Sequence, residues 1–365
     1  MTIVNKHLMK IKPYQPGRPI EEVKRELGLK DVVKLASNEN PYPPSPKVLA
    51  ALGRAARSVN RYPDGGCYYL RRAMARLLKV DPRQLVFANG SDELIILCLR
   101  AFARSGDEII TAKPTFLIYE IAARVIGARV KPIPLKDFHY DLDRMAAAVS
   151  ARTRMIFIGN PDNPGGQYIP AKDLQRFLNR IPKRVMIFMD EAYYEYAVHQ
   201  ADYPDTIRQL ARYPNMIISR TFSKMYGLAG LRIGYGVGTL KVIDVVNRVK
   251  EPFNVNSLAQ AAAVACIQDR PYYRGLAREI ERQRRYLYKQ LTDLGVSFVP
   301  TYTNFILIHV GRKACVMARQ LLQRGMIVRD MSAWGLKDYI RVTFGTEAEN
   351  RQFIKVFRTL YRQQH

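Results

Sequence analysis

The sequence predicts an α/β protein: a large domain with a mostly parallel central sheet flanked by helices, joined to a smaller α/β domain. Two observations support this fold class. From Ser45 onward, short apolar runs alternate with stretches of helical periodicity. A long basic amphipathic helix then separates this region from a second, shorter α/β pattern. Strands that are apolar on both faces suit a parallel sheet covered by helices, and 365 residues suffice for one large and one smaller core.

The elements of the larger region follow from this periodicity. The first 45 residues are irregular and rich in proline, apart from a short helix at about 20–27. Helices are then predicted at 46–59, 66–79, 91–104, 115–126, 141–149 and 170–180. Strands are predicted at 85–88, 108–111, 155–158, 185–189 and 216–219. These elements place the large domain at residues 45–270.

The second region begins with the long helix, at about 271–294, which we expect to connect the two domains. After it come predicted strands at 304–308, 326–328 and 339–343, a helix near 313–324 and a final helix from Glu347. This compact α/β unit, completed by the N-terminal segment, predicts a small domain made of residues 1–44 and 271–365.

The composition argues against several classes of protein. The net charge of +26 is spread along the whole chain, and its densest patches are typical of solvated helix faces, so we expect no nucleic-acid partner. No apolar run approaches the roughly 20 residues that span a bilayer, and the first residues lack the apolar core of a signal peptide, so we expect no membrane partner. Four scattered cysteines without a CxxC pair indicate free thiols, no metal site and a cytoplasmic location.

Lys224 is the most informative residue for function. It lies in a glycine-rich segment with Thr221 and Ser223 before it and Arg232 after it. A lysine that forms a Schiff base with a phosphorylated aldehyde needs a nearby group of anion-binding residues, and two hydroxyls and an arginine suit one phosphate. Pyridoxal 5′-phosphate (PLP) is the usual cofactor of that description.

A carboxylate follows one of the apolar strands. Asp190 ends the strand at 185–189, where open α/β sheets place groups that bind ligands. Beside a pyridine nitrogen it would keep that nitrogen protonated and make the ring an electron sink. Tyr193, three residues later, could hydrogen-bond the phenolic oxygen of the ring. The structural alternative is an N-cap Asp190 that begins a short helix.

Three further segments suit the same cofactor. Asn163 lies in an irregular turn rich in proline and glycine and could donate to a phenolate oxygen, although a plain turn is equally consistent. Ser91 and Asp92 follow a strand and a glycine turn, which points a helix N-terminus at a phosphate, but Ser91 could also be a simple N-cap. Phe116 could stack on an aromatic ring, although an unaided phenylalanine is more often part of a core.

Two arginines lie near the end of the chain. Arg341 interrupts an apolar strand pattern, and a buried arginine requires an anion such as a carboxylate or phosphate. Arg329 is a second candidate, with an ion pair to Asp330 or a solvated edge as its structural alternatives.

The order of these motifs resembles the fold-type I PLP enzymes of the aspartate aminotransferase superfamily, over nearly the full length. Within this superfamily the chain is similar to the histidinol-phosphate aminotransferases. The narrower resemblance rests on the segments 13–17, 34–41, 61–64, 253–256 and 341–343. It implies a fold-type I PLP-dependent transferase and amino transfer between L-histidinol phosphate and 2-oxoglutarate, giving imidazole acetol phosphate and L-glutamate.

The resemblance also implies roles in the cofactor site. Lys224 would bind PLP covalently and later move a proton between substrate Cα and the C4′ atom of the cofactor. Asp190 would pair with the pyridine nitrogen, Asn163 and Tyr193 would hold the phenolic oxygen, and Phe116 would stack on the ring. The cofactor phosphate would be bound by Ser91, Asp92, Thr221, Ser223 and Arg232.

Other roles concern the substrate and a second subunit. Tyr62 would reach the phosphate of the cofactor in a neighbouring subunit, which implies a homodimer with a shared active site. Tyr14, Arg329 and Arg341 would bind the anionic end of the substrate, and Asn38, in the matching segment 34–41, is a further candidate for substrate binding.

One residue departs from the family pattern, and several alternatives stay open. The family usually has Asn-Pro-Thr-Gly where this chain has Gly165 in place of the threonine, which is expected to loosen that turn. An aromatic amino-acid aminotransferase would also need Arg341. A PLP-dependent decarboxylase of a phosphorylated amino acid shares the scaffold. A DNA-binding regulator would require an additional domain, for which the roughly 40 residues before the large domain are too few.

Overall fold

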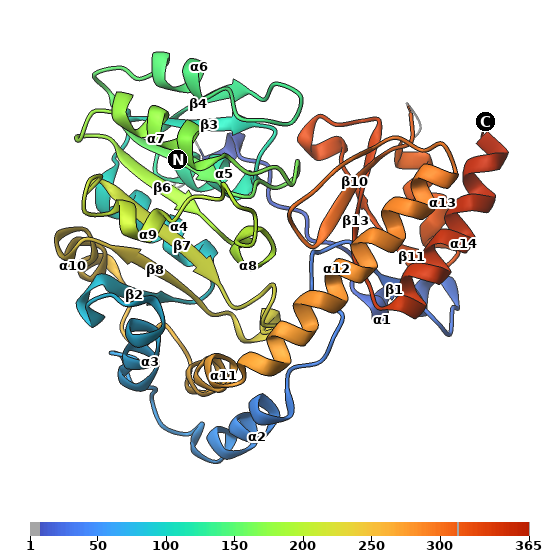
Figure 1. Cartoon of the computed structure of the whole chain (residues 1–365), viewed down its shortest axis with the longest axis horizontal. Helices are drawn as coiled ribbons and strands as arrows, with labels where there is room; N and C mark the ends of the chain where they lie inside the picture. Colours follow the sequence, from blue (N-terminus) through green and yellow to red (C-terminus); the bar gives the residue numbers. More distant parts are fainter. Residues whose placement is uncertain (1–7, 312–313, 365) are drawn as a thin grey trace, which may run out of the picture.

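The computed structural model describes residues 8–311 and 314–364, arranged as a large α/β part and a smaller one linked by a long helix (Figure 1). Predictions that fall on residues 1–7, 312–313 and 365 lie outside the described residues. The predicted α/β class is confirmed. Among the described residues, no helix combines the length and apolar character needed to cross a membrane.

A seven-stranded sheet forms the centre of the large part. Its strands, in chain order, are β2 (Leu85–Ala88), β3 (Glu108–Lys113), β4 (Arg129–Pro134), β5 (Thr153–Gly159), β6 (Met186–Asp190), β7 (Met216–Thr221) and β8 (Gly234–Gly238). Their order across the sheet is β2-β8-β7-β6-β5-β3-β4. The pairs from β7 through β6, β5 and β3 to β4 are parallel, whereas β8 runs antiparallel to both β2 and β7. The sheet is therefore mostly parallel, as predicted.

Two of these strands were not predicted, for different reasons. β4 is an edge strand with mostly exposed residues and two prolines, Pro132 and Pro134, which only an edge tolerates. β8 contains three glycines, which are typical of turns, so its sequence does not indicate a strand. A Cβ at Gly234 would lie 2.7 Å from the backbone nitrogen of Ser91, and one at Gly236 would lie 2.8 Å from Leu94. These glycines let helix α4 (Ser91–Phe102), which follows β2 in the chain, approach β8 closely.

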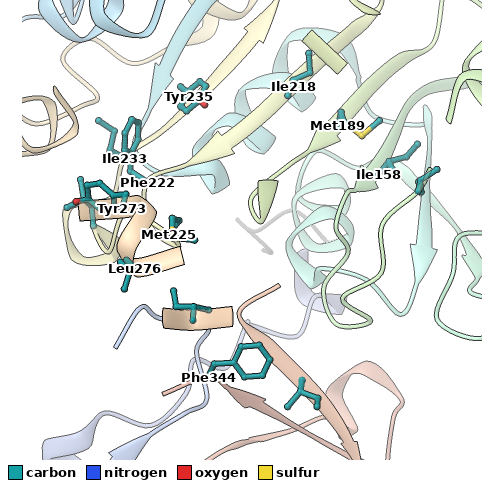
Figure 2. Packing of buried hydrophobic residues seen from close by; sticks show 14 of the residues in the cluster. Ile158, Met189, Ile218, Phe222, Met225, Ile233, Tyr235, Tyr273, Leu276 and Phe344 are labelled. Atoms are coloured by element: carbon teal, nitrogen blue, oxygen red, sulfur yellow. The ribbon is translucent and has the colours of Figure 1, made fainter. Parts of the chain in front are cut away.

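Helices cover both faces of this sheet. Those of the large part are α2 (Pro46–Ala55), α3 (Tyr68–Leu78), α4 (Ser91–Phe102), α5 (Leu117–Val125), α6 (Leu142–Ala147), α7 (Ala171–Arg180), α8 (Tyr194–Ala197), α9 (Thr206–Gln209), α10 (Leu240–Val249) and α11 (Ser257–Gln268). The six helices predicted from periodicity agree with α2 to α7 to within a few residues. Alternate residues of the central strands enter two separate cores. Figure 2 shows one of them, with the cross-strand neighbours Ile158, Met189 and Ile218 in the same cluster.

The smaller part is built on an antiparallel sheet in the order β12-β13-β10-β9. Its strands are β9 (Phe298–Val299), β10 (Phe305–His309), β12 (Arg329–Asp330) and β13 (Tyr339–Thr343). Helix α12 (Arg270–Asp293) leads into it from the large part, and the described parts of the two remaining helices are α13 (Ala314–Gln323) and α14 (Glu347–Gln364).

The N-terminal segment lies beside this smaller part. Helix α1 (Ile20–Leu27) is followed by β1 (Val33–Lys34), which pairs in parallel with β11 (Met326–Ile327). The backbone nitrogen of Thr343 on β13 also donates to the carbonyl oxygen of Leu35 at 2.8 Å. These contacts carry the chain on to Asn38 at the boundary between the two parts.

Candidate active site

A cavity of about 250 Å³ lies where the carboxyl ends of the parallel strands meet the smaller part. Its lining includes fourteen of the fifteen residues predicted for the site. From the large part come Ser91, Asp92, Phe116, Asn163, Asp190, Tyr193, Thr221, Ser223, Lys224 and Arg232. From the N-terminal segment and the smaller sheet come Tyr14, Asn38, Arg329 and Arg341. The fifteenth, Tyr62, is outside it.

Lys224 follows β7 in a tight loop. The backbone nitrogen of Ser223 donates to Thr221 Oγ1 at 3.0 Å, and that of Gly227 donates to the Lys224 carbonyl at 3.1 Å. Burial lowers the pKa of the Lys224 amine to about 8, with a smaller contribution from the positive charge of Arg341. An amine with this pKa is partly neutral at physiological pH and can accept a proton or attack a carbonyl carbon.

Asp190 ends β6 with its carboxylate buried. It accepts hydrogen bonds from the Tyr119 hydroxyl at 2.7 Å and from the Ala192 backbone nitrogen at 3.1 Å. Burial raises its pKa to about 6, because little in the cavity compensates the lost hydration of the charge. The alternative interpretation as an N-cap is wrong, since the next helix, α8, has Tyr193 at its N-cap position. The carboxylate thus lies ready for a cationic partner.

Tyr193 and Asn163 belong to a hydrogen-bonded network that spans the two parts. The Tyr193 hydroxyl accepts from Asn38 Nδ2 at 2.8 Å and from Asn163 Nδ2 at 3.5 Å. Arg341 Nη1 donates to Asn163 Oδ1 at 2.5 Å, and Arg341 Nη2 donates to the Ala36 carbonyl at 3.2 Å. Among the residues that the structure describes, the buried Nε atom of Arg341 has no hydrogen-bond partner. Burial lowers the pKa of Arg341 to about 10, so an anion that enters the cavity would relieve an unfavourable charge.

The N-terminus of α4 and Arg232 form an anion-binding corner. Gly90 adopts φ +82° at the N-cap, and a Cβ there would lie 2.4 Å from Arg232 Nη2. Arg232 Nη2 lies 3.4 Å from Asp92 Oδ2. Ser91 is the first residue of the helix and not its N-cap, so that alternative is also wrong. A helix N-terminus with free N–H groups beside a guanidinium is a ready-made phosphate site.

The comparisons with known proteins agree with this geometry. The sequence profile of the family "Aminotransferase class I and II" matches residues 30–357. The chain belongs to this aminotransferase family. It is 47% identical to a histidinol-phosphate aminotransferase of Moorella thermoacetica, over 97% of this chain and 92% of that protein. It is 44% identical to that of Methylobacillus flagellatus, over 95% and 94%.

Solved structures of aminotransferases have the same fold. The histidinol-phosphate aminotransferase from Sinorhizobium meliloti, crystallised with PLP, superposes with a TM-score of 0.92 at 27% identity, covering 100% of this chain and 99% of that one. The aspartate aminotransferase of Thermus thermophilus has a TM-score of 0.85 at 20% identity, covering 99% and 100%, and shares the fold. The chain is therefore a fold-type I, PLP-dependent aminotransferase.

The residues of the cavity fit this cofactor. They provide a lysine with a lowered pKa, a helix N-terminus beside Arg232, and the buried carboxylate of Asp190. Gly90 leaves open a space that any side chain would fill. Phe116 forms part of the wall, with its ring in an edge contact 5.5 Å from that of Tyr119.

Tyr62 is the one predicted residue that the fold does not bring to the cavity of its own chain. Its side chain is 84% exposed and stacks on Phe253, with ring centroids 4.8 Å apart. Phe253 is itself about half exposed, so two aromatic rings lie together on the surface of this aminotransferase. The role of Tyr62 in a neighbouring subunit stays a prediction.

Gly165, the departure from the family pattern, has a structural reason. A Cβ at this position would lie 3.1 Å from the carbonyl oxygen of Phe138 and 3.3 Å from its Cβ. Phe138 lies in a tight turn with φ +63°, and its ring contacts that of Tyr339 on β13. The space of the usual threonine side chain is thus occupied by a neighbouring loop, and the expected loosening of the turn gives way to close packing.

Sequence reasoning missed two aromatic residues of the site. Tyr119, which donates to Asp190, lies one helical turn after Phe116, but nothing local marks it as a partner of a distant carboxylate. Trp334 lines the cavity from a short 3₁₀ turn, Ser332–Trp334, and is the only tryptophan in the chain. A single tryptophan in a chain with many aromatic residues gave no signal of its own.

Proposed function

We propose that this aminotransferase exchanges the amino group of L-histidinol phosphate with 2-oxoglutarate, giving imidazole acetol phosphate and L-glutamate in histidine biosynthesis. Relatives with this name are 40–47% identical over nearly the whole chain. The observation that carries the proposal is the position of Arg329 and Arg341, which face the cavity that contains Lys224. The site therefore offers two cations to the anionic end of a substrate whose amine can reach Lys224.

The residues of the chain would have the following roles in the reaction. Lys224 would hold PLP covalently through its amine, and the same amine would act as the acid and base that moves a proton at substrate Cα. When bound, PLP supplies a ring that accepts the electron pair left on Cα. Asp190 would hold the pyridine nitrogen in its protonated form, while Asn163 and Tyr193 would orient the phenolic oxygen.

The remaining residues bind and orient. The cofactor phosphate is held by Ser91, Asp92, Thr221, Ser223 and Arg232, with Phe116 against the ring. Asp92 acts through its backbone N–H, because its carboxylate would repel a phosphate and already faces Arg232. The substrate is held by Tyr14, Asn38, Arg329 and Arg341.

We also propose a homodimer, a division into two domains and a cytoplasmic location. The exposed stack of Tyr62 on Phe253 supports the homodimer, because exposed aromatic pairs are typical of interfaces. The domains are residues 45–270, and residues 1–44 with 271–365. Three of the four cysteines are buried free thiols, which suits a reducing compartment.

A titration of the PLP-loaded enzyme tests the substrate. The visible absorbance of the bound cofactor is followed while L-histidinol phosphate is added, and the titration is repeated with L-phenylalanine. Conversion at a much lower concentration of the phosphate ester supports the proposal. Efficient conversion by L-phenylalanine alone would make the protein an aromatic amino-acid aminotransferase. A Lys224→Ala variant is the control and should give no conversion with either compound.

A further inference from the structure

Trp334 lies between the two arginines of the substrate end. Its side chain is 5% exposed and forms part of the cavity wall. The guanidinium carbon of Arg329 is 5.1 Å from the centre of the Trp334 ring, and that of Arg341 is 5.7 Å from it. Both distances are within the range of cation–π attraction, for which tryptophan is the strongest aromatic partner. One ring therefore contacts both cations.

The two arginines repel each other in this structure. Arg329 and Arg341 are directly opposite on the antiparallel strands β12 and β13, a position in which like charges destabilise a sheet. Within residues 8–311 and 314–364, neither forms an ion pair with a carboxylate. Their hydrogen bonds go to neutral oxygens, among them the Gln15 carbonyl and Asn163 Oδ1. The cavity thus has two positive charges that no anion of the described chain neutralises.

The ring of Trp334 is held rigidly in place. Its Nε1–H donates to the Thr115 carbonyl at 3.0 Å, and the Thr115 hydroxyl donates to Asp162 at 2.7 Å. Asp162 precedes Asn163, which accepts from Arg341, so a chain of contacts leads from the ring back to the arginine. The turn before the ring is fixed by Asp330, whose Oδ1 accepts from both the backbone nitrogen and the hydroxyl of Ser332.

We propose that Trp334 is a positioning residue that holds Arg329 and Arg341 as a doubly charged pair, which selects a phosphate dianion over a carboxylate monoanion. An aromatic ring stabilises each cation without occupying the N–H donors that bind the ligand, whereas a carboxylate in its place would neutralise the pair. This inference rests on the proposed function, because it takes the preferred substrate to be a phosphate ester.

Two variants distinguish the effect of the aromatic ring from the effect of side-chain size. Trp334→Phe keeps an aromatic face and loses the N–H donor, and Trp334→Leu keeps an apolar side chain without a π system. For Trp334→Leu, we expect KM for L-histidinol phosphate to rise about 10- to 50-fold, with kcat within about threefold, from the loss of two cation–π contacts. KM for L-phenylalanine, whose carboxylate has one charge, should change less than about threefold. Trp334→Phe should restore most of the lost affinity for the phosphate ester.

A matched control and a binding assay complete the test. Phe298→Leu, on β9 of the same small sheet, should leave both KM values unchanged, because Phe298 is not in the cavity wall. Calorimetric titration of the PLP-loaded enzyme with inorganic phosphate and with acetate measures the selectivity without turnover. The affinity for phosphate should fall about tenfold in Trp334→Leu and the affinity for acetate should change far less.

Several outcomes would overturn the role of Trp334. They are equal losses for phosphate and carboxylate, a loss of kcat alone, or equal behaviour of the Phe and Leu variants. A wild-type enzyme that does not convert L-histidinol phosphate would instead refute the proposed function. In that case the phosphate titration still decides the inference, since an unchanged affinity for phosphate in Trp334→Leu contradicts it.

Discussion

Replacing Gly90 with alanine should weaken PLP binding by about one to two orders of magnitude. Gly90 has φ +82° and ψ 164° at the N-cap of α4, a region that is essentially restricted to glycine and costs other residues about 1–3 kcal/mol. The new Cβ would lie 2.4 Å from Arg232 Nη2, so the guanidinium has to move away. A lost hydrogen bond between a guanidinium and a phosphate costs about 1.5–3 kcal/mol. The strain is present with and without PLP and lowers stability, so the lost contact of about 1.5–3 kcal/mol sets the effect on binding, and each 1.4 kcal/mol is tenfold in Kd.

Equilibrium dialysis of the apoenzyme against PLP measures this effect. Gly230→Ala is the matched control, because Gly230 lies in the 3₁₀ turn Ala229–Leu231 just before Arg232 and a Cβ there would meet nothing within 4 Å. The control should bind PLP as the wild type does. The same measurement in a Lys224→Ala background removes the covalent bond and leaves the phosphate contribution. A Gly90→Ala protein whose Kd for PLP stays within threefold of the wild type would refute the reasoning.

Three further substitutions test the surroundings of the site. The pKa of Asp190 is about 6 in the folded protein and near 4 in the unfolded chain, so its protonated carboxyl stabilises the fold at low pH, and this stabilisation is lost as the pH rises through about 6. Asp190→Asn removes the ionisable group and should therefore stabilise the apoenzyme by about 3 kcal/mol above pH 6. Urea unfolding at pH 4.5 and pH 8 measures this gain, which should shrink at the lower pH. Glu191→Gln should destabilise the protein by about 3–5 kcal/mol, because Arg220, whose Nη2 lies 2.7 Å from Glu191 Oε2, would remain buried without its partner charge. Gly165→Thr should cost about 1–3 kcal/mol in the same assay, because its Cβ would press on Phe138.

Each of these substitutions has its own control. If Asp190→Asn raised the free energy of unfolding by the same amount at both pH values, burial of the carboxylate would not be the cause of its raised pKa. For Glu191→Gln, the paired change Glu191→Leu with Arg220→Met should recover much of the loss, and a loss as large as in the single variant would contradict the argument from an unpaired charge. For Gly165→Thr, the addition of Phe138→Gly should relieve the contacts with the Phe138 side chain but not the one with its carbonyl oxygen, so only part of the loss should be recovered, and an equal loss with and without that change would rule out the Phe138 side chain as its cause.

The sequence was informative where chemistry and local pattern coincide. Lys224 among hydroxyls and glycines, and Asp190 at the end of an apolar strand, were both readable because the carboxyl ends of parallel strands meet at one edge. The strand β8 was not, since its glycines carry no strand signal and are explained only by the approach of α4. The opposition of Arg329 and Arg341 depends on strand register, which the sequence did not specify, and the position of Trp334 between them depends on it too.

The pairing of β1 with β11 has a consequence for synthesis. Val33 pairs with Met326, about 290 residues later, so the first strand waits for the synthesis of those residues before it can take its final place. At a typical rate of about 5–20 residues per second, that wait on the ribosome lasts about 15–60 seconds. Asn38 and Tyr14 reach the cavity only after this pairing, because they lie on the same N-terminal segment. The nascent chain can fold its large sheet early, but β1 can take its place beside the substrate-binding wall only after Met326 has been made.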